Sequence, residues 1–238
     1  MQQWTEQVKA LDLKPTGAEV RPAATVVLVR DGADGLEVLL ARRAASLDFH
    51  GGAWVFPGGR IDAEDFGDDA DDLEAAARRG AAREALEEAG VHVDAEALVY
   101  LSSWTTPEIS PKRFATWFFV GEVGGGDEQA DGGETTELRW FRPADALAAR
   151  EAGEIELAPP QYVSLLAVAE YPDAAAALAG VAASEPLVVT PRIHFSDGPA
   201  IAIYDDDIAY DDVGRLDEDG PRHRLVMGSA GWSYERGP

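Results

Sequence analysis

Three glutamates, Glu84, Glu87 and Glu88, lie close together in a segment whose composition predicts a helix. Their spacing of i, i+3 and i+4 places all three carboxylates on one face of that helix. Like charges at these separations repel one another by about 0.2–0.5 kcal/mol per pair. A hard divalent cation bound through carboxylate oxygens relieves this repulsion. The pattern therefore indicates a metal site, although a solvated acidic helix face would have the same pattern.

A glycine-rich turn precedes this helix in the sequence. The run Trp-Val-Phe-Pro-Gly-Gly at residues 54–59 predicts a short buried strand that ends in a tight turn. Glycine allows the backbone to approach a ligand closely, so the carbonyl of Gly59 is a further candidate oxygen ligand. The helix is expected to end at Gly90, because glycine favours the left-handed conformation at helix C-termini. Arg83 is expected to brace the carboxylates through charge-assisted hydrogen bonds.

Together, the turn and the helix resemble the signature of the Nudix hydrolases. The family pattern is glycine, five residues, glutamate, seven residues, then Arg-Glu, an aliphatic residue, any residue, Glu-Glu, any residue, glycine and an aliphatic residue. Here Gly59 opens the pattern and residues 83–91 close it. The chain departs from the pattern at Asp65, which replaces the first glutamate, and at the small residue Ala85. Seventeen residues, instead of seven, separate Asp65 from Arg83, and this Asp-rich insertion is typical of a solvated loop leading into a helix.

A second stretch, residues 39–59, resembles the motif of the coenzyme A diphosphatase branch of this family. That motif is Leu-Leu-Thr-any-Arg-Ser/Ala, then a spaced arginine and glycine, then Phe-Pro-Gly-Gly. The spacing agrees throughout, but Ala41 stands in place of threonine and Asp48 in place of arginine. A strand and turn of the common core would explain the same residues. The substrate therefore stays open between coenzyme A or acyl-coenzyme A and ADP-ribose or another nucleotide sugar.

The resemblance implies metal-dependent hydrolysis of the pyrophosphate bond in a nucleoside diphosphate linked to another moiety. It assigns the catalytic groups to Glu87, Glu84, Glu88 and Arg83. It assigns the ligands of Mg²⁺ or Mn²⁺ to Gly59, Glu84, Glu87 and Glu88. Some similar domains only bind a nucleotide derivative as sensors, and these usually have a degraded carboxylate set. The set is complete here, which favours an enzyme.

Substrate contacts are expected from residues close to the turn and from a later strand, namely Arg42, Arg43, Phe56 and Glu137. Lys112 and Arg113 are further cations placed to meet phosphates, and His50 lies near the turn. The general base stays open among Glu87, Glu134 and Glu137. A solvated surface position is the alternative for each of these charged side chains.

The resemblance also implies an α+β fold, a Nudix-type α/β/α sandwich with a mixed sheet and a C-terminal extension of helices and strands. The expected domains are an N-terminal arm at 1–21, the Nudix hydrolase domain at 22–152 and an extension at 153–238 that forms a cap or a dimer surface. Strands are expected at 24–30, 36–43, 97–106, 114–123, 135–142, 187–196, 200–204 and 224–227. Helices are expected at 2–14, unless this stretch is a loose arm, and at 143–151, 159–170 and 173–183.

The chain is strongly acidic, with a net charge of −24 from 20 basic and 44 acidic residues. A field of this sign disfavours nucleic acids and anionic membranes as partners, and an anionic substrate needs a metal to approach. No apolar run is long enough to span a bilayer, and the absence of cysteine excludes disulfides and thiol chemistry. The start of the sequence lacks the features of a secretory signal. We therefore expect a cytoplasmic protein that binds a small nucleoside diphosphate derivative, with a homodimer as an alternative to the monomer.

Overall fold

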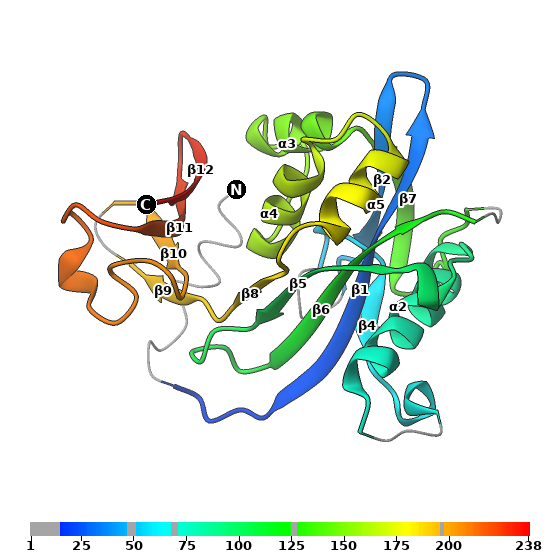
Figure 1. The fold of residues 1–238 in the computed structure, drawn as a ribbon, viewed down its shortest axis with the longest axis horizontal. Helices are drawn as coiled ribbons and strands as arrows, with labels where there is room; N and C mark the ends of the chain where they lie inside the picture. Colours follow the sequence, from blue (N-terminus) through cyan, green and yellow to red (C-terminus); the bar gives the residue numbers. More distant parts are fainter. Residues whose placement is uncertain (1–14, 47–50, 68–70, 125–127, 196–197) are drawn as a thin grey trace. The chain divides into compact units, whose positions relative to one another are not determined.

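The computed structural model describes residues 15–46, 51–67, 71–124, 128–195 and 198–238 (Figure 1). The described chain divides into two units. The larger unit contains residues 21–103 and 116–187, and the smaller unit contains 15–20, 104–115 and 188–238. All the residues that the sequence assigns to catalysis and metal binding lie in the larger unit. The predicted helix at 2–14, Asp48 and His50 lie outside the described residues.

A mixed sheet forms the centre of the fold and has eight strands within the described residues. Their order is β3-β2-β1-β6-β5-β8, with β4 paired to β1 and β7 paired to β2. The strands are β1 (Val20–Gly32), β2 (Gly35–Arg43), β3 (Trp54–Val55), β4 (Gly58–Arg60), β5 (Val99–Thr105), β6 (Arg113–Glu122), β7 (Thr135–Phe141) and β8 (Leu187–Val189). The long β1 carries a run of β-branched and aliphatic residues, which suit a strand buried on both faces.

The helices of the larger unit are α2 (Leu73–Ala89), α3 (Pro143–Glu151), α4 (Pro159–Val168) and α5 (Ala174–Ala182), with short 3₁₀ turns η1 (Ala63–Phe66) and η2 (Ala95–Ala97). The helix that carries the glutamates, α2, begins at the N-cap Asp72, whose carboxylate accepts a hydrogen bond from Ala75 N. It ends at Gly90, which has a φ of 68° and donates its N–H to Leu86 O. Both ends therefore follow local capping chemistry that is visible in the sequence.

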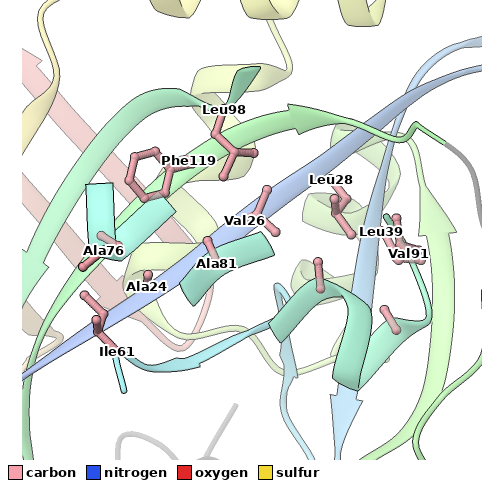
Figure 2. Packing of buried hydrophobic residues seen from close by; sticks show 13 residues of the cluster. Ala24, Val26, Leu28, Leu39, Ile61, Ala76, Ala81, Val91, Leu98 and Phe119 are labelled. Carbon is pink, nitrogen blue, oxygen red and sulfur yellow. The ribbon is translucent and has the colours of Figure 1, made fainter. Parts of the chain in front are cut away.

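The main core lies between α2 and the sheet (Figure 2). The helix contributes only small side chains to it, and the sheet contributes larger ones that include Val26, Leu28 and Phe119. Burying each of these larger side chains stabilises the fold by about 1.5–3 kcal/mol. The neighbouring residues of β1, Val27 and Val29, point to the opposite face and are also fully buried. Helix α3 contacts β2 and β7, so both faces of the sheet are covered and the predicted α/β/α sandwich is confirmed.

The smaller unit contains a four-stranded antiparallel sheet in the order β12-β11-β10-β9. Its elements are β9 (Arg192–His194), β10 (Ala200–Ile203), the 3₁₀ turn η3 (Val213–Arg215), β11 (Arg222–Gly228) and β12 (Gly231–Gly237). Its interior holds an ion pair in which Arg224 donates to both carboxylate oxygens of Asp207 at 2.6 and 2.7 Å. The strands of this sheet fall within the predicted extension at 153–238, whereas β8, which also falls there, joins the eight-stranded sheet.

Several predicted boundaries are wrong. The strand expected at 187–196 is two strands, β8 and β9, because Pro191 between them has no N–H to donate to a ladder. The strand expected at 97–106 is Val99–Thr105, because Ala97 belongs to the turn η2 and Leu98 follows it. Strand β1 begins before Pro22, four residues earlier than expected. Strand β12 was not predicted, although the alternation of Trp232 and Tyr234 after Gly231 is a strand signal.

Among the described residues, none of the helices combines the length and the apolar character that crossing a bilayer requires.

Candidate active site

The Gly58-Gly59 turn is placed beside α2 by its pairing with β1. Strand β4 runs antiparallel to β1, with Gly58 opposite Thr25 and Gly59 opposite Ala24. The buried hydroxyl of Thr25 donates to Pro57 O at 2.6 Å and so fixes the residue that begins the turn. A Cβ on Gly58 would lie 2.5 Å from Thr25 Cβ, and a Cβ on Gly59 would overlap the carboxylate of Glu84. Gly58 therefore has no room for a side chain against the backbone of β1, whereas a side chain on Gly59 would force the carboxylate of Glu84 to move.

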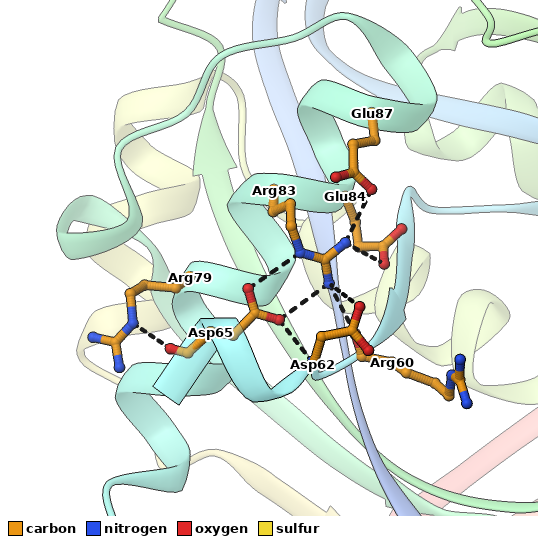
Figure 3. Close-up of polar contacts among 7 residues, drawn as sticks. All are labelled: Arg60, Asp62, Asp65, Arg79, Arg83, Glu84 and Glu87. Atoms are coloured by element: carbon orange, nitrogen blue, oxygen red, sulfur yellow. Dashed lines mark hydrogen bonds and ion pairs between the residues drawn. The ribbon is translucent and has the colours of Figure 1, made fainter. Parts of the chain in front are cut away.

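Arg83 lies between two groups of carboxylates (Figure 3). On one side, Nε and Nη2 donate to the two oxygens of Asp65, each at 3.1 Å. On the other side, Nη1 donates to Glu84 Oε1 at 2.9 Å and to Glu87 Oε2 at 3.0 Å. Nη2 also donates to Arg60 O at 3.0 Å. The hydrogen bond with Asp65 raises the pKa of Arg83, so the guanidinium stays charged while it joins Asp65 to two of the three glutamates.

Asp65 occupies the position where the family pattern has glutamate. Its side chain is 5% exposed and also accepts a hydrogen bond from Asp62 N at 2.8 Å. Residues 73–82 of the longer insertion after it form the first turns of α2, and this helix brings Arg83 to the same carboxylate. Arg79, one turn before Arg83, donates to the backbone carbonyls of Asp65 and Phe66 and ties η1 to the helix. The aspartate and the longer insertion therefore do not prevent a bidentate contact between a carboxylate at this position and Arg83.

The three glutamates of α2 have different surroundings. Glu88 is 6% exposed and accepts a hydrogen bond from Gly58 N at 3.0 Å. Burial raises the pKa of Glu88 to about 7, against the opposing effect of the Gly58 N–H. Burial also raises the pKa of Glu84, although Arg83 opposes this. The side chain of Glu87 is 58% exposed, so this carboxylate faces solvent at the end of the row.

Two predicted polar residues, Arg43 and Glu134, lie close to Glu88. They form an ion pair at 3.6 Å, and the charge of Arg43 lowers the pKa of Glu88 whereas that of Glu134 raises it. A β-bulge between Arg42 and Arg43 changes the register of β2 against β7 at this point, and a bulge can redirect a side chain. Arg43 Nε is buried and has no hydrogen-bond partner among the described residues. Arg43 is therefore the predicted substrate residue with unused hydrogen-bonding capacity.

The remaining predicted substrate residues lie elsewhere. Arg42 and Glu137 are cross-strand neighbours that form an ion pair with each other at 3.5 Å, and both are about half exposed. Phe56 is 2% exposed, so its ring belongs to the core that supports the turn. Arg113 and Lys112 lie in the smaller unit. The assignment of these residues to substrate binding stays a prediction.

Sequence reasoning missed three positions that shape the site. These are Thr25, which holds the turn, Asp62, whose carboxylate lies 3.8 Å from Arg83 Nη2, and the carbonyl of Arg60. Only pairing between strands or packing of η1 on α2 brings them to the site. Asp62 stands close to Asp65 in the sequence and could have been considered, whereas nothing local distinguishes Thr25 from other strand residues.

The carboxylates of α2 are oxygen donors of the type that a divalent metal binds. Among the described residues, no three His, Cys, Asp or Glu side chains converge as a preformed metal site. Glu84 and Glu87 each give one oxygen to Arg83, and Glu88 gives one to Gly58 N. The second oxygen of each accepts no hydrogen bond within the described chain. A row of oxygen donors beside a glycine backbone suits Mg²⁺ or Mn²⁺ in donor type, provided that the carboxylates turn from their present partners.

Comparisons with known proteins point to one family. The family model described as the NUDIX domain matches residues 19–160. A NUDIX hydrolase from Alicyclobacillus acidocaldarius is similar in structure, with a TM-score of 0.62 and 27% identity over 69% of this chain and 97% of that chain.

Two further solved structures share less with this chain. A MutT NUDIX hydrolase from Burkholderia pseudomallei has a TM-score of 0.48 and 19% identity over 63% of this chain and 98% of its own. The NUDIX domain of Shewanella oneidensis NrtR, solved with ADP ribose, has a TM-score of 0.46 and 20% identity over 68% of this chain and 94% of its own. With TM-scores below 0.5, these two similarities do not bear on substrate. No curated protein matches the sequence.

Proposed function

The chain belongs to the Nudix hydrolase family and is a pyrophosphatase, and we propose that its reaction depends on the glutamates of α2. The observation that carries this proposal is the arrangement of Glu84, Glu87 and Glu88 on one helix face beside the Gly58-Gly59 turn. Arg83 holds two of these carboxylates and is itself held by Asp65. This arrangement supports a site built for a cation and an anionic substrate together.

The three glutamates and the carbonyl of Gly59 are the residues that would hold Mg²⁺ or Mn²⁺. A divalent metal bound there would neutralise the oxygens of a diphosphate and would activate water for attack. Because Glu88 is buried and its pKa is about 7, a cation beside it would favour its charged form. Arg83 keeps the charges of the row in place through hydrogen bonds and needs no contact with substrate.

The chemical step is the attack of water on phosphorus. The water oxygen forms a bond to phosphorus, the anhydride P–O bond breaks, and the second phosphate leaves with the bond's electron pair. A carboxylate of the chain accepts the proton that the water loses. The candidates for this role are Glu87, Glu134 and Glu137. Each of them pairs with an arginine in the structure, so these ion pairs do not distinguish among the three.

The proposed substrate is coenzyme A or acyl-coenzyme A. This choice is supported by the spacing of residues 39–59, which agrees with the coenzyme A motif, and by the position of its arginine, Arg43. The side chain of Arg43 is 20% exposed, and its buried Nε has no partner among the described residues. A substrate phosphate would reach this donor after the Arg43 side chain turns outward, and would then add a charge-assisted hydrogen bond.

A hydrolysis panel with Mg²⁺ or Mn²⁺ tests the proposal. The substrates are coenzyme A, acyl-coenzyme A, ADP-ribose, NADH and nucleoside triphosphates, and each is assayed with the wild type, Glu87→Gln and Glu74→Gln. Cleavage of coenzyme A to phosphopantetheine and adenosine 3′,5′-bisphosphate is expected, with a loss of roughly 10²- to 10⁴-fold in kcat for Glu87→Gln. Chelation with EDTA should abolish turnover.

Glu74→Gln is the matched control, because Glu74 is an exposed residue in the first turn of the same helix. It should leave kcat unchanged. Preferential cleavage of ADP-ribose would show that ADP-ribose, and not coenzyme A, is the substrate. Wild-type turnover by Glu87→Gln at saturating Mg²⁺ would remove Glu87 from the mechanism, and binding without any cleavage would contradict an enzymatic role.

A further inference from the structure

Helix α2 contains one glycine among its seventeen residues, Gly80, in the middle of an otherwise alanine-rich run. Glycine in a helix interior is less favourable than alanine because it loses more backbone freedom on folding. The adjacent Ala81 and Ala82 show that alanine is accepted at neighbouring positions of this helix. Gly80 is therefore locally unfavourable in the helix that carries the site, and the contacts around it explain why glycine stands there.

The reason lies in the space between Gly80 and Asp65. A Cβ placed on Gly80 would lie 3.1 Å from Asp65 Oδ2, 3.5 Å from Asp65 Cγ and 3.8 Å from Ile61 Cγ1. A separation of 3.1 Å is tighter than almost all real Cβ contacts. Alanine at this position would therefore push the carboxylate away by a few tenths of an ångström.

Asp65 cannot move without losing hydrogen bonds. Its two oxygens accept from Arg83 Nε, Arg83 Nη2 and Asp62 N at 2.8–3.1 Å. The residue is 5% exposed, so water does not readily replace a lost partner. Gly80 and Arg83 are three residues apart and share one face of α2. The carboxylate thus lies over Gly80 and reaches Arg83 from there.

We propose that Gly80 is a positioning residue, and that Gly80 and Asp65 act as a matched pair that sets the place of Arg83. Aspartate is one methylene shorter than the glutamate of the family pattern, so it must lie closer to the helix to make the same bidentate contact. The missing side chain of Gly80 allows this approach. Arg83 then holds Glu84 and Glu87. The effect on turnover rests on the function proposed above, whereas the effect on Arg83 does not.

The first experiment follows Arg83 in the metal-free protein by NMR, because this measurement is independent of turnover. The Nε–Hε resonance of Arg83 is recorded in the wild type and in Gly80→Ala, and its exchange with water is measured. We expect the resonance to shift and its exchange to become faster in Gly80→Ala, since its acceptor Asp65 is displaced. An unchanged resonance with unchanged exchange would overturn the proposal. Gly80→Ser, which carries a Cβ at the same place, repeats the test if Gly80→Ala is not recovered as folded protein.

The second experiment measures kcat, KM and Tm for Gly80→Ala in the wild-type and Asp65→Glu backgrounds. In the wild-type background, we expect kcat to decrease about tenfold, since a full ångström of misplacement costs about 10²-fold. We expect the Tm to change little, because the gain in helix propensity opposes the weakening of the Asp65 hydrogen bonds. In the Asp65→Glu background, the longer side chain can reach Arg83 from further away. The decrease in kcat caused by Gly80→Ala should therefore be at least about threefold smaller than in the wild-type background.

Equal losses in the two backgrounds would overturn the pairing, because independent positions give additive effects. A decrease in Tm with no change in kcat would also overturn it, since that result describes packing alone. Loss of all turnover in the wild type would contradict the proposed function but leave the NMR result valid. Ala82→Ser, at a partly exposed position of the same helix, is the control and should leave the Arg83 resonance in place.

Discussion

A single guanidinium organises the candidate site at the level of residues. Arg83 contacts Asp65, Glu84, Glu87 and a backbone carbonyl at the same time, which requires a planar group with several donors. A lysine carries one compact ammonium and cannot make these contacts together. The glutamates of α2 would then repel one another without a fixed partner, and their positions would vary.

Substitution of Arg83 by lysine tests this dependence. We expect Arg83→Lys to remain folded and to lose about 10²-fold in kcat, since the carboxylates are misplaced but still present. The measurement is steady-state kinetics at saturating metal, with circular dichroism to establish the fold. Arg78→Lys is the control, because Arg78 lies on the same helix and pairs with Glu74 instead. Wild-type kcat for Arg83→Lys would show that the point charge alone is sufficient.

In the smaller unit, the buried ion pair of Asp207 and Arg224 makes the stability of the fold depend on pH. Burial alone would raise the pKa of Asp207, but hydrogen bonds from Arg224 and from the N–H groups of Ala209 and His223 outweigh it and lower this pKa. A depressed pKa means that the folded state holds the charged form more tightly than the unfolded state does. The resulting stability is present above the unfolded pKa of about 3.9 and is lost as the pH falls through the lower folded value.

We therefore expect Asp207→Asn to be destabilised at neutral pH by about 3–5 kcal/mol, because Arg224 would keep a buried charge without a partner. The difference from wild type should decrease below pH of about 4. The free energy of unfolding of the two proteins is measured by urea denaturation, followed by near-UV circular dichroism, at neutral pH and below pH of about 4. Asp206→Asn is the control, since Asp206 is 80% exposed and should change the free energy of unfolding by less than about 0.5 kcal/mol. An equal loss at both pH values would contradict the linkage.

At the level of elements, α2 serves the core with one face and the site with the neighbouring one, and the buried Glu88 lies where the two faces meet. Its buried face is built from five alanines, Ala76, Ala77, Ala81, Ala85 and Ala89, all with no exposed surface. Small side chains let the helix backbone lie close to the sheet, and this closeness brings Glu88 within hydrogen-bond distance of Gly58 N. The packing of one face therefore sets the geometry of the other.

Enlarging an alanine of the buried face should separate the helix from the sheet. We expect Ala81→Leu to lower the free energy of unfolding by about 1–3 kcal/mol through overpacking, and to weaken Mn²⁺ binding as well. Urea denaturation and titration with Mn²⁺ measure the two effects. Ala82→Leu is the matched control, because Ala82 is partly exposed and should change neither quantity much. An unchanged free energy of unfolding in Ala81→Leu would contradict this prediction, because it would show that the core rearranges to accommodate the larger side chain.

At the level of the whole molecule, the charge of −24 affects both stability and substrate approach. Acidic groups repel one another in the folded state, and anionic substrates enter against the same field. Salt reduces these interactions, since the Debye length falls from about 10 Å at 0.1 M to about 3 Å at 1 M. The acidic excess therefore makes the protein sensitive to ionic strength.

We expect the Tm to increase when NaCl is raised from about 0.1 M to about 1 M, because self-repulsion is screened over this range. Thermal unfolding followed by circular dichroism measures this effect. A neutral osmolyte at the same osmolality is the control for general exclusion effects, and it should raise the Tm less. A Tm that is constant or falls with salt would show that ion pairs such as those of Arg83 outweigh the repulsion.

The sequence alone determined the family and predicted the location of the chemistry, because both depend on short-range patterns. Glu84, Glu87 and Glu88 share a helix face at any place in a fold, and Asp72 and Gly90 cap the helix through neighbouring atoms. The buried runs of β1 and β2 likewise predict strands without knowledge of their partners. These features depend on spacing, and spacing is visible in the sequence.

The tertiary structure decided how distant residues combine. Thr25 meets Pro57, Gly58 meets Glu88 and Asp65 meets Arg83 across 32, 30 and 18 positions of the chain. Strand pairing and helix packing bring these atoms together, and no local pattern encodes them. The same reason explains the missed strand β12, which is defined by its ladder with β11. Residue types and their spacing therefore predicted the chemistry, whereas long-range packing decided which groups hold it in position.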